Sequence, residues 1–320
     1  NEAEPEILYS STMHGDETTG MIFMLRLIDY LLTNYGTLDR ATNMVNNVAL
    51  YIAPDTNPDG TYYGGNSTVS GSRRSNYNGV DLNRDYPNPR QGANTPYAAE
   101  TQAMMDYASE HHFILGGNFH GGIELVNYPW DSWYSNERTH ADNDWFAVVS
   151  REYADLAQAN SPSGYMTAED NGITHGADWY PAYGSRQDYM NYWHYCKEVT
   201  FEVSNTKLLG SELLPAYWTY NQDAILTYVE NAYYGVRGLV TNTNGDPLDA
   251  VITILDYDID NSHAITDPEN GDYYRMLLPG SYEMKFEAYG YIPQTIIANV
   301  TADQETSLDV VLQQANVISL

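Results

Sequence analysis

The segment HGDE, residues 14–17, combines two side chains that can bind a metal ion. His14 offers an imidazole nitrogen and Glu17 a carboxylate oxygen, and both can reach one ion from a single turn of backbone. Catalytic zinc sites use such nitrogen and oxygen sets, with three protein ligands and an open position for water. The pair alone is weak evidence, because a histidine and a glutamate at this spacing occur often by chance.

A second histidine, His120, stands in the segment NFHGG, where it ends a strand-like run and precedes glycines that permit close backbone approach. HGDE follows another strand-like run, and ligands of open α/β sheets gather at the carboxyl ends of strands. Taken alone, His120 could be a hydrogen-bonded histidine of the core. Together with His14 and Glu17, it predicts one zinc site.

Arginines are concentrated in and beside the segment RSNYNGVDLNRDYP, residues 74–87, although the chain has only 14 lysines and arginines. The four arginines of this region are Arg73, Arg74, Arg84 and Arg90. A guanidinium suits bidentate binding of a carboxylate and stabilisation of an oxyanion. Local ion pairing with Asp81 and Asp85 is the alternative interpretation, and the spacing leaves both open.

The charge balance restricts the partners of the chain. With 43 acidic and 14 basic side chains, the formal net charge is −29. Such a surface repels nucleic acid and anionic lipid, so we expect no nucleic-acid partner, and it attracts cationic ligands. The same charge could equally serve only the solubility of a secreted or salt-adapted protein, so it decides little by itself.

Two further features bear on the compartment. No apolar run approaches the roughly 18 residues that a membrane span requires, so we expect no membrane span. Cys196 is the only cysteine, which rules out an internal disulfide bond. No signal peptide is visible, and the chain opens almost directly on a strand, as if earlier residues had been trimmed.

The pattern of the chain predicts two domains. From residue 6 to about 232, strand-like and helix-like segments alternate, which is typical of an α/β sheet. We expect strands at 6–12, at 48–54, in the first half of FILGGNFHGG and at 198–204, and helices near 19–34, 97–111, 140–159 and 212–233. After Tyr234, short alternating segments separated by turn residues predict a small all-β sandwich. The expected domains are 1–233 and 234–320.

Five segments, in order along the chain, resemble motifs of the M14 family of zinc carboxypeptidases, in particular the regulatory branch that includes carboxypeptidases D, E and N. HGDE resembles the HxxE motif, GVDLNRDYP the G-x-D-x-N-R segment, and NFHGG with NYPWD the third-ligand segment. NGITHGADWYPAYGSRQDY resembles the substrate-clamping loop, and CKEVTFEVSNTK the strand that carries the catalytic glutamate. VRGLVTN through LLPGSYEMKFEAYGY resembles the transthyretin-like sandwich of this branch.

The resemblance covers nearly the whole chain and implies a fold and a cofactor. The implied fold is a mixed sheet flanked by helices, followed by a small all-β transthyretin-like sandwich. His14, Glu17 and His120 would bind one Zn²⁺ per chain, with water at the open position. Asp81 would orient a ligand imidazole, as second-shell carboxylates do for zinc-bound histidines.

The resemblance also implies the catalytic groups. Glu202 would be the general base and later the proton donor. Glu198 lies on the same face of a regular strand, so spacing alone does not choose between the two, and the motif alignment selects Glu202. Arg74 and the zinc would stabilise the oxyanion. The free carboxylate of the substrate would be held by Asn83, Arg84 and Tyr180.

The preference for a terminal residue is implied by two further positions. Asp131 stands where basic-specific members carry an aspartate at the floor of the side-chain pocket, and Gln187 matches a pocket glutamine. The sequence therefore predicts a preference for C-terminal Lys or Arg. A basic terminal side chain would pair with the Asp131 carboxylate, whereas an apolar one would leave that charge buried and unpaired, which is costly. Asp131 could instead be only a turn residue. Arg186 departs from the family pattern and would repel a basic side chain if it pointed into the pocket.

The resemblance has further consequences. Family members normally have a helix and two edge strands before the first strand, so we expect the N-terminal portion to be missing here. Secretion or periplasmic export is implied. Two alternative functions remain: a catalytically silent zinc-fold module that binds basic C-termini, and a carboxypeptidase of cell-wall or glutamate-tailed substrates. For 234–320, we expect an interaction or folding module.

Overall fold

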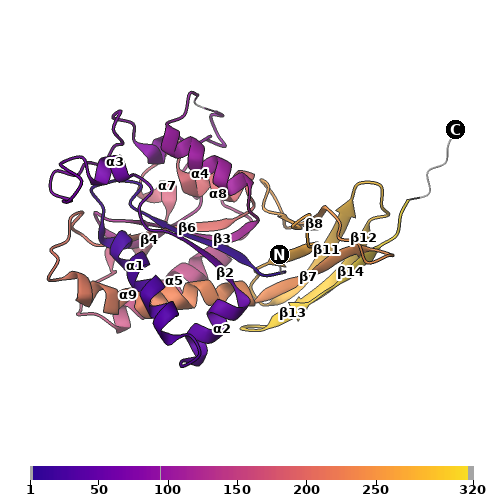
Figure 1. The fold of residues 1–320 in the computed structure, drawn as a ribbon. Coiled ribbons are helices and arrows are strands. Elements are labelled where there is room, and N and C mark those ends of the chain that lie inside the picture. Colours follow the sequence, from indigo (N-terminus) through magenta and orange to yellow (C-terminus); the bar gives the residue numbers. More distant parts are fainter. Residues whose placement is uncertain (1–2, 94, 316–320) are drawn as a thin grey trace. The chain divides into compact units, whose positions relative to one another are not determined.

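The computed structural model describes residues 3–93 and 95–315, which form two compact units (Figure 1). One unit is Glu6–Val229. The other begins at Glu230, runs to the end of the described chain and includes the residues that precede Glu6. The first is an α/β unit, and the second opens with the short helix η2 (Asn231–Tyr233) and is otherwise built of β-strands.

The α/β unit contains a six-stranded mixed sheet with the order β2-β1-β3-β6-β4-β5. Its strands are β1 (Glu6–Ser11), β2 (Ala49–Ala53), β3 (Phe113–His120), β4 (Glu124–Tyr128), β5 (Ile173–His175) and β6 (Lys197–Val203). β2, β1, β3 and β6 run parallel, whereas β4 pairs antiparallel with β6. The mixed sheet predicted from the sequence is therefore confirmed. β3 and β6 are buried along their whole length, as central strands covered on both faces should be.

Helices cover both faces of this sheet (Figure 1). The longer ones are α1 (Thr19–Asn34), α2 (Asp39–Asn47), α4 (Ala99–Ser109), α5 (Asn143–Ala159), α8 (Arg186–Trp193) and α9 (Leu214–Glu230). Because neighbouring residues of a strand point to opposite faces, Leu8 packs in the cluster that contains Tyr189 of α8, and Tyr9 stacks on Tyr228 of α9. Shorter helical turns lie in the connections between strands and longer helices: α3 (Pro58–Thr61), η1 (Leu82–Arg84), α6 (Ala168–Asn171) and α7 (Gly176–Trp179).

Gly117 shows why the middle of β3 is glycine-rich. A Cβ atom at this position would lie 2.6 Å from the ring of Tyr9 and 2.7 Å from the ring of Phe201. Those rings are part of the aromatic layer on one face of the sheet, where Tyr153 also stacks on Phe201. A side chain at Gly117 would push this layer away from the strand.

The second unit consists of two four-stranded sheets around one apolar core. Its strands are β7 (Gly235–Asn242), β8 (Ala250–Ile254), β9 (Ala264–Ile265), β10 (Asp272–Arg275), β11 (Gly280–Ala288), β12 (Gln294–Val300), β13 (Glu305–Ser307) and β14 (Val310–Leu312). β10-β7-β13, with β14 also on β7, form one sheet, and β12-β11-β8-β9 form the other. Val240, Ile252 and Phe286 are fully buried between them. The predicted all-β region is confirmed.

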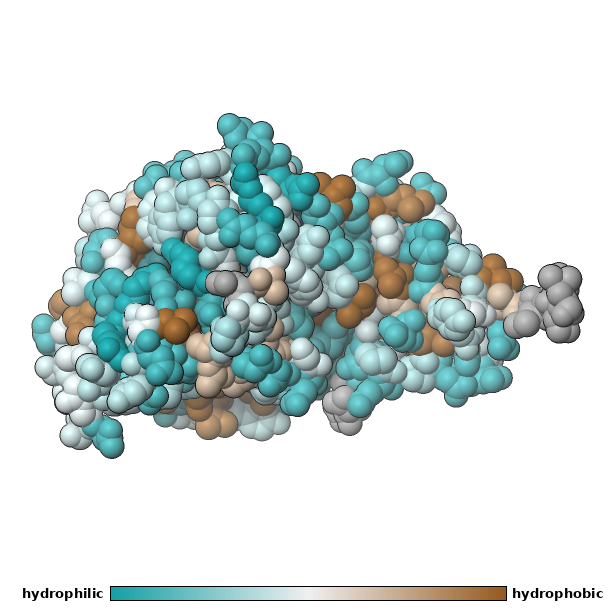
Figure 2. Space-filling view, turned by 90° about the horizontal axis from the view of Figure 1, so that it is seen from above, coloured by the Kyte–Doolittle hydropathy of each residue, from teal (hydrophilic) through white to brown (hydrophobic). Residues whose placement is uncertain are grey.

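None of the helices in the described ranges has the length and apolarity to cross a membrane. On the face shown in Figure 2, the α/β unit is mostly hydrophilic, and its hydrophobic residues form small separate groups.

Candidate active site

His14, Glu17 and His120 converge at the carboxyl edge of the sheet. His14 and Glu17 lie in the loop between β1 and α1, and His120 is the last residue of β3. Glu17 Oε2 lies 3.0 Å from His14 Nδ1 and 2.9 Å from His120 Nδ1. The two Nδ1 atoms are 3.0 Å apart. All three residues are buried, so two imidazole nitrogens and one carboxylate oxygen face a common point.

The protonation states of these side chains fit a zinc ion. Burial by itself raises the pKa of Glu17, but hydrogen bonds from His120 and His14 outweigh burial and hold the pKa well below its usual range. Burial lowers the pKa of His120 to about 4. An ionised carboxylate and a neutral imidazole are the forms that bind Zn²⁺, so the donor set suits this metal.

Each imidazole contacts a further polar side chain through its Nε2 atom. His14 Nε2 lies 3.1 Å from Asp81 Oδ1, and His120 Nε2 lies 2.9 Å from Asn118 Nδ2. Asp81 can accept the Nε2–H of His14, which leaves Nδ1 free for a metal ion, as in oriented metal-binding histidines. Asn118 contacts the corresponding nitrogen of His120, and both rings turn Nδ1 towards the site. Asn118 was not singled out from the sequence. The alternation of β3 was the available signal, since it places Asn118 on the same face as His120.

Glu202 lies beside the ligands because β6 is the parallel neighbour of β3. Its register partner on β3 is His120. Glu202 is 8% exposed, and its Oε2 has no hydrogen-bond partner in the described part of the chain. Burial, followed by the nearby Glu17, raises its pKa well above the usual range. A buried carboxylate with a free oxygen and a raised pKa suits a group that takes up and releases a proton.

One cavity joins Glu202 to most of the other predicted site residues. Its wall includes His14 and His120 together with Arg74, Asn83, Asp131 and Tyr180. Residues of the wall that the sequence did not indicate are Asn127, Trp179, Ala182 and Thr200. Arg84 lies beside this wall, with Nη1 donating to Asn83 O at 2.6 Å and its guanidinium 5.8 Å from the ring centre of Tyr180.

Asp131 lines the cavity, is buried, and accepts hydrogen bonds from neutral donors. Its Oδ1 accepts from Asn127 Nδ2 at 3.0 Å and from Gln187 Nε2 at 3.2 Å. Burial raises the pKa of Asp131 and outweighs the opposing effects of its hydrogen bonds and of the Arg84 charge. No ion pair to Asp131 occurs among the described residues. Asp188 accepts the backbone N–H of Asp131 at 2.8 Å and so fixes this segment.

Arg186 points away from Asp131. Its side chain is 1% exposed, and Nη2 lies 2.8 Å from Glu198 Oε2, while Nη1 donates to Ser10 Oγ. In this orientation, Arg186 does not point into the pocket, so it would not repel a basic side chain of the substrate there. The backbone N–H of Arg186 donates to Asn83 Oδ1 at 3.0 Å, which links α8 to the cavity.

Comparison with known sequences is consistent with this geometry. Residues 1–224 match the profile of Peptidase_M14, described as zinc carboxypeptidase, and residues 235–313 match the carboxypeptidase regulatory-like domain. Carboxypeptidase D of Homo sapiens is 34% identical over 96% of this chain but only 23% of the relative. Carboxypeptidase M of Mus musculus is 34% identical over 90% of this chain and 67% of the relative. The carboxypeptidase N catalytic chain of Rattus norvegicus is 31% identical over 98% of this chain and 75% of the relative. The chain thus spans less than a quarter of carboxypeptidase D.

Solved structures share the fold. The crystal structure of thrombin activatable fibrinolysis inhibitor aligns with a TM-score of 0.59 at 19% identity, covering 72% of this chain and 62% of that one. Carboxypeptidase A from Helicoverpa armigera aligns with the same TM-score and identity, covering 71% and 60%. At this identity, the alignments show a common fold.

Proposed function

The chain belongs to the Peptidase_M14 family of zinc carboxypeptidases, and on this premise we propose that it hydrolyses the C-terminal peptide bond of peptides and proteins, with a preference for terminal Lys or Arg. The observation that carries the proposal is the cavity itself. It is lined by His14 and His120 of the candidate metal cluster, by Glu202, whose Oε2 is unpaired among the described residues, and by the buried Asp131.

One Zn²⁺ held by the three ligands would polarise the scissile carbonyl and make a water molecule more acidic. Glu202 would accept a proton from the attacking water at Oε2 and return it to the leaving amine. One carboxylate can act first as base and then as acid, because the proton that it takes from the water is the proton that it gives to the leaving amine. Its raised pKa brings the ionised and protonated forms closer in free energy near neutral pH, and the exchange uses both forms.

Arg74 would stabilise the oxyanion. Its Nη1 lies 3.1 Å from His14 Nδ1 and 3.4 Å from Glu17 Oε1, so the guanidinium borders the cluster. Its Nε donates to Asp81 Oδ2 at 2.9 Å, which fixes the plane of the guanidinium. A positive group oriented before reaction stabilises negative charge that develops on the carbonyl oxygen.

A carboxylate clamp would restrict the enzyme to chain ends. Asn83 and Tyr180 line the cavity, and Arg84 lies against both. Together they offer an amide, a phenol and a guanidinium, which are donors that suit a carboxylate. An internal peptide bond has no such group to bind, so one residue would be removed at a time.

The preference for Lys or Arg follows from the buried Asp131. A terminal cation would pair with its carboxylate, whereas a terminal Phe would leave the charge buried and unpaired. The test is a comparison of kcat/KM for otherwise identical peptides that end in Arg, Lys, Phe or Glu, with zinc-loaded protein. We expect the Arg and Lys peptides to have the highest kcat/KM. Equal cleavage of the Phe peptide would refute the basic preference, and faster cleavage of the Glu peptide would favour glutamate-tailed substrates.

The alternative function, a catalytically silent zinc-fold module, predicts a different result in the same assay. Such a protein would bind basic C-termini without turnover. The presence of Glu202, buried and unpaired beside the ligands, favours catalysis. Zinc-loaded protein that binds the Arg peptide but releases no arginine would support the alternative.

Secretion or periplasmic export is part of the proposal, and it rests on the family resemblance. Its test is the distribution of the protein between the medium, the periplasm and the cytoplasm of its source cells. Retention in the cytoplasm would refute it.

A further inference from the structure

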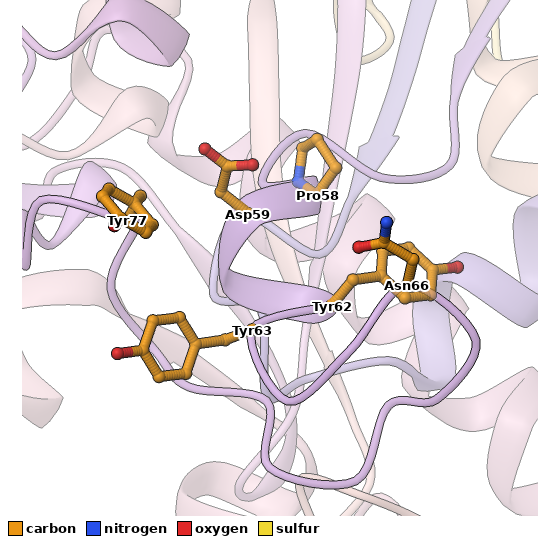
Figure 3. Close-up of a pocket in the computed structure, with 6 residues that line it drawn as sticks. All are labelled: Pro58, Asp59, Tyr62, Tyr63, Asn66 and Tyr77. Carbon is orange, nitrogen blue, oxygen red and sulfur yellow. The ribbon is translucent and has the colours of Figure 1, made fainter.

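A second cavity, of about 410 Å³, lies where α3 and the chain that follows it meet the segment around Tyr77. Its wall consists of Pro58, Asp59, Tyr62, Tyr63, Asn66 and Tyr77. Figure 3 shows Tyr63 and Tyr77 on one side, Tyr62 and Asn66 on the other, and the Asp59 carboxylate between the two sides. We call this cavity the tyrosine pocket. None of the residues assigned to the proposed reaction lines it.

Arg73 holds two of these tyrosines in place. Its guanidinium carbon lies 3.5 Å from the ring centre of Tyr63, and its Nη2 donates to the backbone oxygen of Tyr77 at 2.5 Å. The rings of Tyr63 and Tyr77 are also neighbours, with centres 6.5 Å apart. The aromatic wall therefore already accepts one guanidinium, at Tyr63, by a cation–π contact.

Asp59 gives the pocket its charge preference. Its carboxylate is exposed and, within residues 3–93 and 95–315, takes part in no hydrogen bond or ion pair. A ligand cation could therefore pair with Asp59 while its hydrocarbon stem packs on a tyrosine ring. The net charge of −29 favours the same class of ligand. A neutral sugar could stack on the rings but would leave the carboxylate without a counter-ion.

The tyrosine pocket includes residues of α3, and α3 packs on the loop that carries two of the proposed metal ligands. A Cβ atom at Gly15, within HGDE, would lie 2.3 Å from the backbone of Gly60 in α3. Asn57, which precedes α3, donates to Met13 O at 2.9 Å, and Arg73 N donates to Gly60 O at 3.0 Å. α3 is thus packed backbone to backbone against the loop that carries two ligands.

From these contacts we propose that the tyrosine pocket binds a Lys or Arg side chain of the peptide substrate, upstream of the scissile bond. This inference rests on the proposed carboxypeptidase function. The enzyme would then read two cations on one substrate, the terminal one at Asp131 and an internal one at Asp59. Its substrates would be peptides with clustered basic residues.

The test uses zinc-loaded protein and peptides of constant length that all end in Arg. A single Lys is moved through each upstream position of a Gly and Ser backbone, so no spacing is assumed. We expect one position, or two adjacent ones, to raise kcat/KM roughly three- to ten-fold, the range of an exposed cation–π contact combined with an ion pair. The gain should disappear in Asp59→Asn and in Tyr77→Ala, with the Lys-free peptide cleaved as before. Asp155→Asn, which removes an exposed charge on α5, is the matched control and should keep the gain.

A second measurement separates this inference from the proposed function. Binding of a C-terminally amidated oligolysine needs no carboxylate clamp and no turnover, and calorimetry should show weaker binding to Asp59→Asn than to Asp155→Asn. A flat positional profile, or a gain that survives Asp59→Asn, would overturn the inference while leaving carboxypeptidase activity intact. Binding of a neutral oligosaccharide that is lost in Tyr77→Ala would also overturn it. If no peptide is trimmed, the proposed function fails. The oligolysine comparison still shows whether the tyrosine pocket binds a cation.

Discussion

His120 and Glu202 are register partners on the neighbouring parallel strands β3 and β6. The proposed metal ligand and the proposed base are therefore placed by the hydrogen-bond ladder of the sheet rather than by flexible loops. Both strands are buried along their whole length, which limits local opening. The relative position of these two side chains is consequently among the most strongly determined features of the site.

Glu202→Gln should separate turnover from metal binding. Loss of a positioned acid and base typically lowers kcat by about 10²- to 10⁴-fold, whereas Glu202 is not one of the three ligands. Steady-state kinetics together with the zinc content of the purified variant measures both effects. Glu124→Gln, which changes a glutamate that accepts from Asn205 N and Tyr217 Oη, is the matched control. Full turnover by Glu202→Gln would remove Glu202 from its assigned role.

Removal of the metal should abolish activity and lower stability. A metal that binds only the folded protein stabilises it by mass action, and the expected gain is about 4 kcal/mol when free zinc exceeds Kd a thousandfold. Dialysis against a chelator should therefore lower Tm, and added zinc should restore both Tm and turnover. Glu17→Gln should weaken zinc binding, because a neutral amide replaces a carboxylate ligand. A variant that retains one tightly bound zinc would contradict the ligand assignment.

The sequence was sufficient to predict the edge of the sheet where these residues meet. HGDE and His120 each follow a run of strand-forming residues, and parallel strands bring their carboxyl ends together. The helix at Thr19–Asn34 was found at the expected bounds. α2, β4 and β12 were not anticipated; they have only nine, five and seven residues, and a period is hard to recognise over so short a segment.

Other features of the site depend on tertiary partners that local patterns do not reveal. Alternation on β6 places Glu198 and Glu202 on the same face, so the pattern could not distinguish them. Their neighbours do: Glu198 is covered by Arg186, whereas Glu202 reaches the cavity at the end of the strand. For the same reason, the direction of the Arg186 side chain could be known only once α8 was seen to pack on β6.

Asp131→Asn should reduce selectivity rather than catalysis. The amide keeps the size of the side chain but removes the charge that would pair with a terminal cation, so kcat/KM for an Arg peptide should fall by about two orders of magnitude. The Phe peptide should be affected much less. The ratio of the two kcat/KM values is the measurement, and an unchanged ratio would show that Asp131 does not read the terminal residue.

The raised pKa of Asp131 also predicts a pH dependence. Burial raises this pKa, so the carboxyl group of the free enzyme becomes protonated at a higher pH than an ordinary aspartate. Only the ionised form pairs with a cation, so kcat/KM for Arg peptides should fall as the pH drops through this raised value. The ratio of Arg to Phe cleavage cancels changes in the shared catalytic groups. A ratio that is constant with pH, down to the range of ordinary aspartates, would contradict the prediction.

Arg186→Met should destabilise the α/β unit, because it leaves the Glu198 carboxylate without its cation. Both partners are at most 1% exposed, and breaking one side of such a pair typically costs about 3–5 kcal/mol. Burial already raises the pKa of Glu198, and loss of Arg186 should raise it further. An acid whose pKa is higher in the folded than in the unfolded state loses stability as the pH rises between the two values. Urea unfolding should therefore show a penalty that is smallest at low pH. The double variant Arg186→Met with Glu198→Gln should recover part of the loss and abolish its pH dependence, whereas equal penalties at all pH values would show that lost packing, not the unpaired charge, is responsible.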